Sequence, residues 1–112
     1  MYAVAFDPDL AQRVRASLAE RSDILERKMF GGLAFMLAGN MCCGVIGQDL
    51  MVRLSADAAD AALDEPHTRP MDFTGRPMTG FVYVAPEGTA ADEDVRRWVA
   101  AAVSFASGLP PK

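Results

Sequence analysis

The sequence predicts an α+β fold in which helices pack on a single antiparallel sheet. Three observations predict it: short apolar segments with Gly-rich turns fill residues 28–54, amphipathic helical patterns stand near both ends, and one Ala-rich helical segment separates two groups of strands. The expected order is α-β-β-β-α-β-β-α, giving three helices and a two-layer, five-stranded antiparallel sheet. A chain of 112 residues has the size of a single domain, here residues 1–112.

The first helix is expected near the N-terminus and should end at about Arg21. Asp7 fits the N-cap, and Pro8 fits the first helical position. An apolar face recurs every four residues, while the opposite face is polar. This apolar face consists of Leu10, Val14 and Leu18.

Three strands in an antiparallel meander are expected next. Within the first we expect the pair Gly31-Gly32 to form a bulge or a close backbone approach. Turns at Gly39-Asn40 and at Gly47 separate the strands. The expected strands are residues 28–37, 41–46 and 50–54.

The second half of the chain should hold a short helix and a hairpin. Ser55 fits the N-cap of an Ala-rich helix that ends before Pro66. Residues 67–70 read as an exposed connection, and a turn at 74–77 separates the last two strands. These strands are expected at residues 71–73 and 78–84.

The last helix has the clearest pattern in the sequence. Thr89 or Asp92 is expected to cap it, and apolar residues follow helical spacing from Val95 to Ala106. Gly108 and the prolines after it are typical of a helix end.

Composition describes an acidic domain with a high apolar content. Hydrophobic residues make up 51% of the chain and charged residues 23%, which excludes a disordered tail. The net charge of −4 argues against direct binding of nucleic acid through a basic face. The pairs Arg13/Arg15 and Arg96/Arg97 could form a small basic patch, but solvated arginines paired with acids are the favoured reading.

Residues 29–48 carry no charge and have the length of a membrane span. The glycines in this stretch, and the turn dipeptide Gly39-Asn40, favour two buried strands over a membrane helix. We therefore expect no membrane association.

The two cysteines are adjacent, and we expect neither enzymatic activity nor a cofactor. Neighbouring residues of a strand point to opposite faces, so a disulfide between Cys42 and Cys43 would be strained. Such cysteine usage suits a cytoplasmic protein. A nucleophile formed by a cysteine with His67 is the alternative, but cysteines in apolar strands are more often core residues. The spacing of potential metal ligands matches no common metal site.

The apolar surplus lies in strands that are apolar on both faces. A sheet with helices on one side should be polar on the other, yet 28–37 and 78–84 are not. Three explanations stay open: the helices and the N-terminal arm cover more of the sheet than expected, a bulge at Gly31-Gly32 changes which face the side chains occupy, or the second face contacts a protein partner or a second copy of the chain. Seven methionines in the chain suit an adaptable contact surface.

Three segments resemble the N-terminal domain of the TfoX/Sxy competence regulators. They read KMFGGLAFM at 28–36, LMVRL at 50–54 and MDFTGRPMTGFVYV at 71–84, and the resemblance extends over about residues 7–112. It implies an α+β fold with one antiparallel sheet, like that of secretion chaperones. It also implies a link to regulation of natural competence, where the full regulator works with the cyclic-AMP receptor protein at promoters. It implies no established catalytic residues.

The leading hypothesis is therefore a non-enzymatic regulatory or protein-interaction module that binds a protein partner or forms a homodimer. The alternative is a small-molecule or anion-binding domain with a cavity between sheet and helices. There Gly31-Gly32 would allow a close backbone approach, and Arg53 or Arg76 would hold the anion. The candidate binding residues are Phe30, Gly31, Gly32, Met51, Arg53, Arg76, Phe81 and Tyr83.

Overall fold

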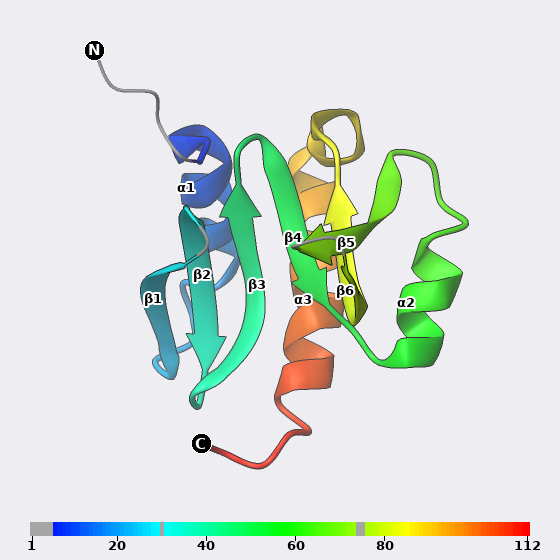
Figure 1. The fold of residues 1–112 in the computed structure, drawn as a ribbon. Helices are drawn as coiled ribbons and strands as arrows, with labels where there is room; N and C mark the ends of the chain where they lie inside the picture. The colour runs from blue at the N-terminus through cyan, green and yellow to red at the C-terminus, as the bar shows by residue number, and fades with distance from the viewer. Residues whose placement is uncertain (1–5, 30, 74–75) are drawn as a thin grey trace.

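An antiparallel sheet forms the centre of the protein, and the helices pack against one of its faces (Figure 1). The computed structural model describes residues 6–29, 31–73 and 76–112, and for residues 72–73 and 76–78 it describes the backbone alone. The sheet has six strands in the order β1-β2-β3-β4-β6-β5, and each neighbouring pair is antiparallel. The predicted α+β class is confirmed, with six strands in place of five.

The bounds of the elements follow the predicted order. The strands are β1 (Ile24–Met29), β2 (Gly32–Leu37), β3 (Asn40–Ile46), β4 (Asp49–Arg53), β5 (Thr68–Phe73) and β6 (Arg76–Val84). The helices of the described residues are α1 (Pro8–Ser17), α2 (Ala56–Ala62) and α3 (Asp92–Ala106), with a 3₁₀ turn at Pro86–Thr89.

The sixth strand arises because the expected strand 28–37 is two strands. β1 and β2 form a hairpin, and Gly31 lies in its connection with a φ of +75°. A positive φ is a turn conformation that glycine adopts without steric cost, so the bulge expected at this position is wrong. The alternative, a close backbone approach, is confirmed at Gly32, where an added Cβ would lie 2.4 Å from the Val45 carbonyl oxygen. β1 begins at Ile24, ahead of the expected start, and its charged centre belongs to the edge of the sheet.

β5 also starts earlier than expected, because residues 68–70 belong to the strand. The Thr68 hydroxyl donates to the carbonyl oxygens of Ala62 (3.1 Å) and Glu65 (2.8 Å) at the end of α2. His67 has a φ of +66° and makes the turn that precedes the strand. The connection predicted over 67–70 is therefore wrong for 68–70, whereas the predicted exposure is confirmed at residues 67, 69 and 70.

The caps of α1 and α2 are confirmed, and that of α3 differs. Asp7 accepts a hydrogen bond from the Asp9 amide, and Ser55 accepts one from the Ala58 amide. At α3 the N-cap is Ala91, without a side-chain hydrogen bond. The carboxylate of Asp92 binds Arg13 of α1 at 2.7 Å instead, and this ion pair joins the starts of the two helices.

α1 ends four residues before the expected position. After Ser17 the backbone hydrogen bonds tighten, so that the Leu18 amide donates to the Arg15 carbonyl oxygen. Such i-to-i−3 bonds are typical of a fraying helix end.

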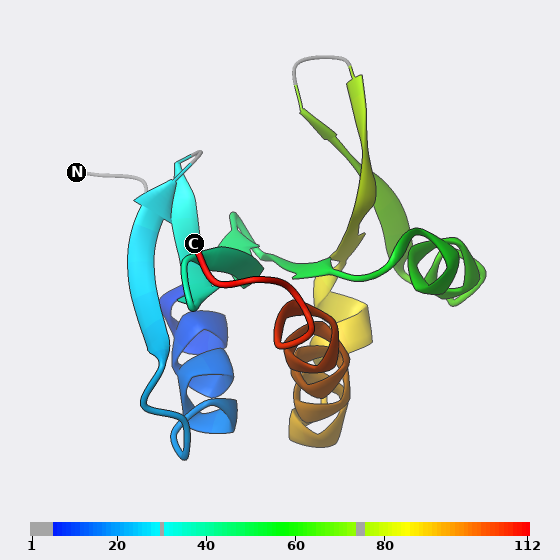
Figure 2. The same cartoon turned by 90° about the horizontal axis from the view of Figure 1, so that it is seen from below.

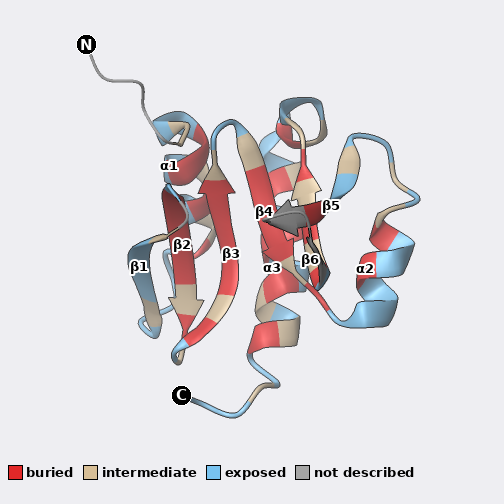
Figure 3. Cartoon of the chain, viewed as in Figure 1, coloured by how far each residue is buried: buried red, intermediate tan, exposed pale blue. Residues whose placement is uncertain are grey.

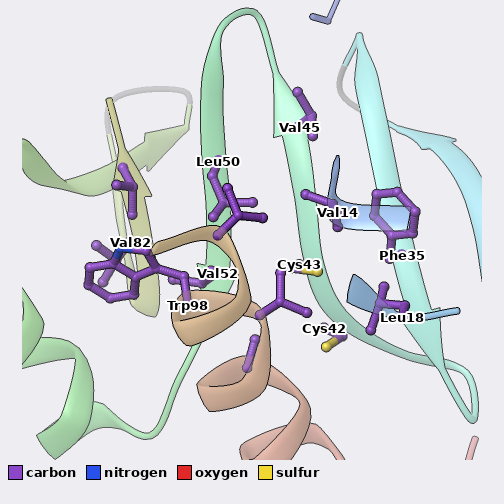
Figure 4. Packing of buried hydrophobic residues seen from close by; sticks show 14 of the residues in the cluster. Val14, Leu18, Phe35, Cys42, Cys43, Val45, Leu50, Val52, Val82 and Trp98 are labelled. Atoms are coloured by element: carbon purple, nitrogen blue, oxygen red, sulfur yellow. The ribbon is translucent and has the colours of Figure 1, made fainter. Parts of the chain in front are cut away.

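One continuous core lies between the sheet and the helices. α1 and α3 lie behind the sheet in Figure 1, and Figure 2 shows them on one side while the β5–β6 hairpin projects to the other. Ala59 and Ala62 of α2 join the same core through β6. The buried positions run along the central strands in Figure 3 and are drawn from close by in Figure 4. Phe35 of β2, which is 1% exposed, has the largest side chain among the fully buried residues.

A β-bulge places both cysteines in this core, so the expectation that they point to opposite faces is wrong. The register pairs Phe35 with Cys43 and Met36 with Met41, which leaves Cys42 as an extra residue of β3. Where a bulge adds a residue, the alternation of side chains is interrupted. Both thiols are buried among the core side chains (Figure 4).

The residues after α3 return to the sheet at the β2–β3 turn. The Asn40 side-chain amide donates to the Pro110 carbonyl oxygen at 2.9 Å, and the Lys112 amide donates to the Ala38 carbonyl oxygen at 2.9 Å. Asn40 is buried, so this bond satisfies a polar group that would otherwise be costly to bury. We call residues 107–112 the C-terminal tail.

We predict that Phe35→Ala lowers the free energy of unfolding by about 3–5 kcal/mol, because it opens a cavity in the core. Leu25→Ala on the neighbouring strand β1 is the matched control. Leu25 is 73% exposed, so its loss should cost less than about 0.5 kcal/mol. Urea denaturation followed by circular dichroism measures both. Equal costs for the two variants would contradict the observed facing of the hairpin.

We also predict a pH-dependent contribution from the ion pair between α1 and β1. Hydrogen bonds from Arg15 lower the pKa of the Glu26 carboxyl below its ordinary value. Because the native pKa is the lower one, this pair stabilises the fold at neutral pH and the stabilisation is lost as the pH falls through the native pKa.

Glu26→Gln should therefore cost about 0.5 kcal/mol at pH 7, and this difference from the unmodified protein should vanish as the pH approaches about 3. Urea titrations across this range measure the difference. Glu20→Gln, at an exposed position after α1, is the control. A Glu26→Gln effect that stays constant with pH would contradict the ionic origin of the contact.

Candidate functional site

The candidate site is the face of the sheet that points away from α1 and α3, which we call the open face. Within the described part of the chain, no helix covers it (Figures 1 and 2). Leu50 and Val52 of β4 lie in the core, so alternation places Met51 and Arg53 on the open face. Ala34 and Met51 are buried but lie outside the core cluster, in agreement with this facing.

Strand register arranges the open face in rows that cross the sheet. One row, which we call the central row, crosses all six strands through consecutive register partners. It consists of Arg27, Ala34, Gly44, Met51, Tyr83 and Arg69. The row thus begins and ends with an arginine, and its middle holds two of the smallest residue types. Met51 fills the space beside Gly44, where its Cε would lie 3.2 Å from an added Cβ.

A second row lies one step nearer the C-terminal tail, and we call it the tail-side row. Leu25, Met36 and Met41 are register partners on β1, β2 and β3. Leu25 is 73% exposed, and the two methionines are half-buried. On the far side of the sheet Arg53 pairs with Phe81 at the corresponding level. The tail-side row is therefore an apolar strip that water reaches.

A hollow of about 380 Å³ lies beside the tail-side row. Its lining combines apolar side chains with two cations. It consists of Leu25, Glu26, Arg27, Met36, Gly39 and Lys112. The C-terminal tail places Lys112 at this hollow through its bond to Ala38.

Aromatic rings hold two arginines in place, Arg69 on the open face and Arg53 at its border with α3, the helix that carries Phe105. The Arg53 guanidinium carbon lies 5.5 Å from the centre of the Phe81 ring and 5.6 Å from that of Phe105. Arg69 lies 4.6 Å from the centre of the Tyr83 ring and pairs with Asp49 at 2.6 Å. Cation–π contacts of this kind hold a guanidinium in place while it keeps its charge.

Burial raises the pKa of the Tyr83 phenol above its ordinary value, with Arg69 acting in the opposite direction. The phenol therefore stays protonated at neutral pH and is able to donate a hydrogen bond at the open face.

Four of the sequence-predicted site residues come together here. Met51 pairs with Tyr83, and Arg53 pairs with Phe81, on neighbouring strands of the open face. Phe30 lies outside the described residues, and so does the side chain of Arg76.

Gly31 and Gly32 lie at the other end of the sheet from Arg53. Gly32 stands at the level of Asp49, and Arg53 is four residues further along β4, about 13 Å at 3.3 Å per residue. A Cβ on Gly32 would lie 2.4 Å from the Val45 carbonyl oxygen, so β3 fills the space beside this glycine. The anion site expected from Gly31-Gly32 with Arg53 is therefore not assembled.

Sequence reasoning missed the contributions of β1 to the open face. Leu25 and Arg27 lie in a charged stretch that was not expected to form a strand. The apolar pair at 24–25 before three consecutive charged residues is the available signal, since charged residues are typical of an edge strand.

Three of the four helix arginines are paired with acids, as the favoured reading expected, and Arg96 is exposed without an ion pair among the described residues. Arg13 binds Asp92, Arg15 binds Glu26, and Arg97 binds Glu65. Arg27, Arg53 and Lys112 differ from them. Within the described residues these three cations take part in no salt bridge.

The cysteines and His67 are not brought together. His67 precedes β5 and lies against Gly88, whereas both cysteines are packed in the core on β3. The hydrogen bond with Cys42, together with burial, raises the pKa of the Cys43 thiol well above its ordinary value. The same hydrogen bond lowers the pKa of the Cys42 thiol. Both side chains are buried, however, so a substrate reaches neither thiol unless the core opens. The described residues contain no cluster of three or more metal-ligating side chains.

One family model matches the chain, that of the TfoX N-terminal domain, over residues 16–106. No curated protein and no solved structure matches. Among the described helices, none has both the length and the apolar character that crossing a membrane requires.

We predict that both native thiols react with a disulfide reagent at least about 100-fold more slowly than in the urea-unfolded chain, because reaction requires opening of the core. Stopped-flow absorbance with Ellman's reagent measures the rates. Ala100→Cys, at an exposed position of α3, supplies a fast control thiol in the same protein. Native cysteines that react as fast as this control would contradict the observed packing.

Proposed function

The chain belongs to the TfoX N-terminal domain family, and on that premise we propose that it is a non-enzymatic protein-interaction module with a regulatory role. The open face is the surface through which it acts. The activity is the formation of a complex, so the residues that matter are those that a partner covers.

The observation that carries this proposal is the apolar tail-side row on a sheet face without a helix. Leu25 is 73% exposed and stands beside the half-buried Met36 and Met41. Burying such side chains against a partner is favourable at about 25 cal/mol per Å² of apolar surface. Methionine side chains are unbranched and adapt to partners of different shape.

The open face also offers polar groups that fix the orientation of a partner. Arg53 is held by two rings at one side of the row, and the Tyr83 phenol lies in the central row. An apolar centre with arginine and tyrosine near it is the composition that residues at the centre of protein interfaces favour.

A photo-crosslinking experiment in cells that express the chain tests the proposal. A benzophenone amino acid at position 36 lies on the open face, and the same group at exposed position 100 of α3 is the control. We expect an ultraviolet-dependent adduct from position 36 and none from position 100. Leu25→Asp should reduce the adduct at least about fivefold, because it places an unpaired charge in the apolar row.

Adducts of equal yield from the two positions, or an adduct at position 36 that Leu25→Asp leaves unchanged, would contradict the assignment of the open face. The mass of the adduct also distinguishes a second copy of the chain from another protein.

A further inference from the structure

We propose that the partner of the open face is an acidic amphipathic protein segment, in which carboxylates flank the apolar side chains. This inference rests on the proposed function, and it names the chemistry of the partner. It follows from the charges around the tail-side row.

The described side chains of the open face carry more positive than negative charge, although the protein is negative overall. The net charge of the chain is −4. The open face nevertheless holds Arg27, Arg53 and Arg69, with Lys112 at its hollow. Of these, Arg69 is neutralised by Asp49. Much of the acidic charge lies on the helices instead, as in the first turn of α3 at Asp92, Glu93 and Asp94.

Three of these cations stand around the apolar row with no described carboxylate partner. Arg27 and Lys112 line the hollow together with Leu25 and Met36, and Arg53 follows Val52, the register partner of Cys43, on the neighbouring strand β4. The carboxylate that also lines the hollow, Glu26, is engaged by Arg15 through two hydrogen bonds. A partner that covers the row therefore meets an excess of positive charge.

This charge excludes a second copy of the open face as the favoured occupant. If two open faces packed together, the same three cations would meet across the interface, and juxtaposed like charges cost several kcal/mol. A partner with carboxylates beside its apolar residues is attracted to these cations instead.

The geometry of the arginines fits carboxylate recognition. Arg53 is held between Phe81 and Phe105, so less side-chain freedom is lost when it binds. A guanidinium donates two parallel hydrogen bonds to one carboxylate, which sets direction as well as affinity.

The size of the face sets the length of the segment. Six strands at 4.8 Å spacing span about 24 Å, the length of a helix of about 16 residues. The middle of the central row is already filled by Met51 beside Gly44, so the apolar side chains of the segment would lie on the tail-side row.

Selection from a display library of random peptides of about 16 residues on the full chain tests the inference. We expect the selected peptides to contain apolar residues at helical spacing and at least about threefold more Asp and Glu than the unselected library. The best peptide is then synthesised, and its affinity for the protein is measured by fluorescence anisotropy.

The double variant Arg27→Glu with Lys112→Glu should bind this peptide at least about tenfold more weakly than the unmodified protein does. The affinity of the unmodified protein for the peptide should fall as salt rises from about 50 to about 500 mM. Both residues are exposed, so folding should be retained. Arg53→Gln provides a second variant that removes charge at the other side of the row. Arg96→Glu is the matched control, because Arg96 is exposed on α3 and takes part in no described salt bridge.

Two outcomes separate the inference from the proposed function. Peptides that lose affinity with Leu25→Asp, yet show neither acidic enrichment nor sensitivity to the arginine variants, overturn the inference and leave the open face as the interaction surface. Peptides that are insensitive to Leu25→Asp, or a library that yields no binder, overturn both. A dimer in sedimentation equilibrium that Met36→Asp dissociates would overturn the acidic partner in favour of a second copy.

Discussion

The structure depends on burial of one face of the sheet against α1 and α3. Phe35, Val45 and Val52 from three neighbouring strands meet the apolar sides of these helices, and one cluster joins all of them. Since both long helices pack on this side, the apolar residues of the opposite face must be shielded from water by other contacts. It does so partly through the central row, where Met51 fills the space left by Gly44. Among the side chains that the structure describes, only the tail-side row keeps a large apolar one mostly in water, at Leu25.

Sequence periodicity predicted the elements that have one buried face and failed at the edges of the sheet. α3 has apolar residues at strict helical spacing, and β4 alternates cleanly, so both were predictable. β1 is exposed along most of its length and has no buried face to impose a pattern. The bulge at Cys42 depends on how β3 meets β2, which local sequence does not encode.

The candidate site was likewise predictable on the central strands and not on the edge strand β1. Met51 and Arg53 were predictable because β4 alternates, and Phe81 and Tyr83 because strand 78–84 is apolar on both faces. Leu25 and Arg27 acquire their role only when β1 pairs with β2 and continues the rows. Gly31-Gly32 was read as a place for a ligand, whereas Gly31 makes the turn and Gly32 makes room for β3. A glycine pair by itself does not distinguish these uses.

The bond between Asn40 and the C-terminal tail has a consequence for the order of folding. The β1–β2–β3 meander is built from contacts close in sequence, which form quickly. Asn40, however, bonds to a carbonyl oxygen 70 positions later in the chain. On a ribosome, where synthesis proceeds from the N-terminus, the turn at Asn40 therefore stays hydrated while α3 is still being made. Closure of the tail over this turn is the step that marks the completed domain.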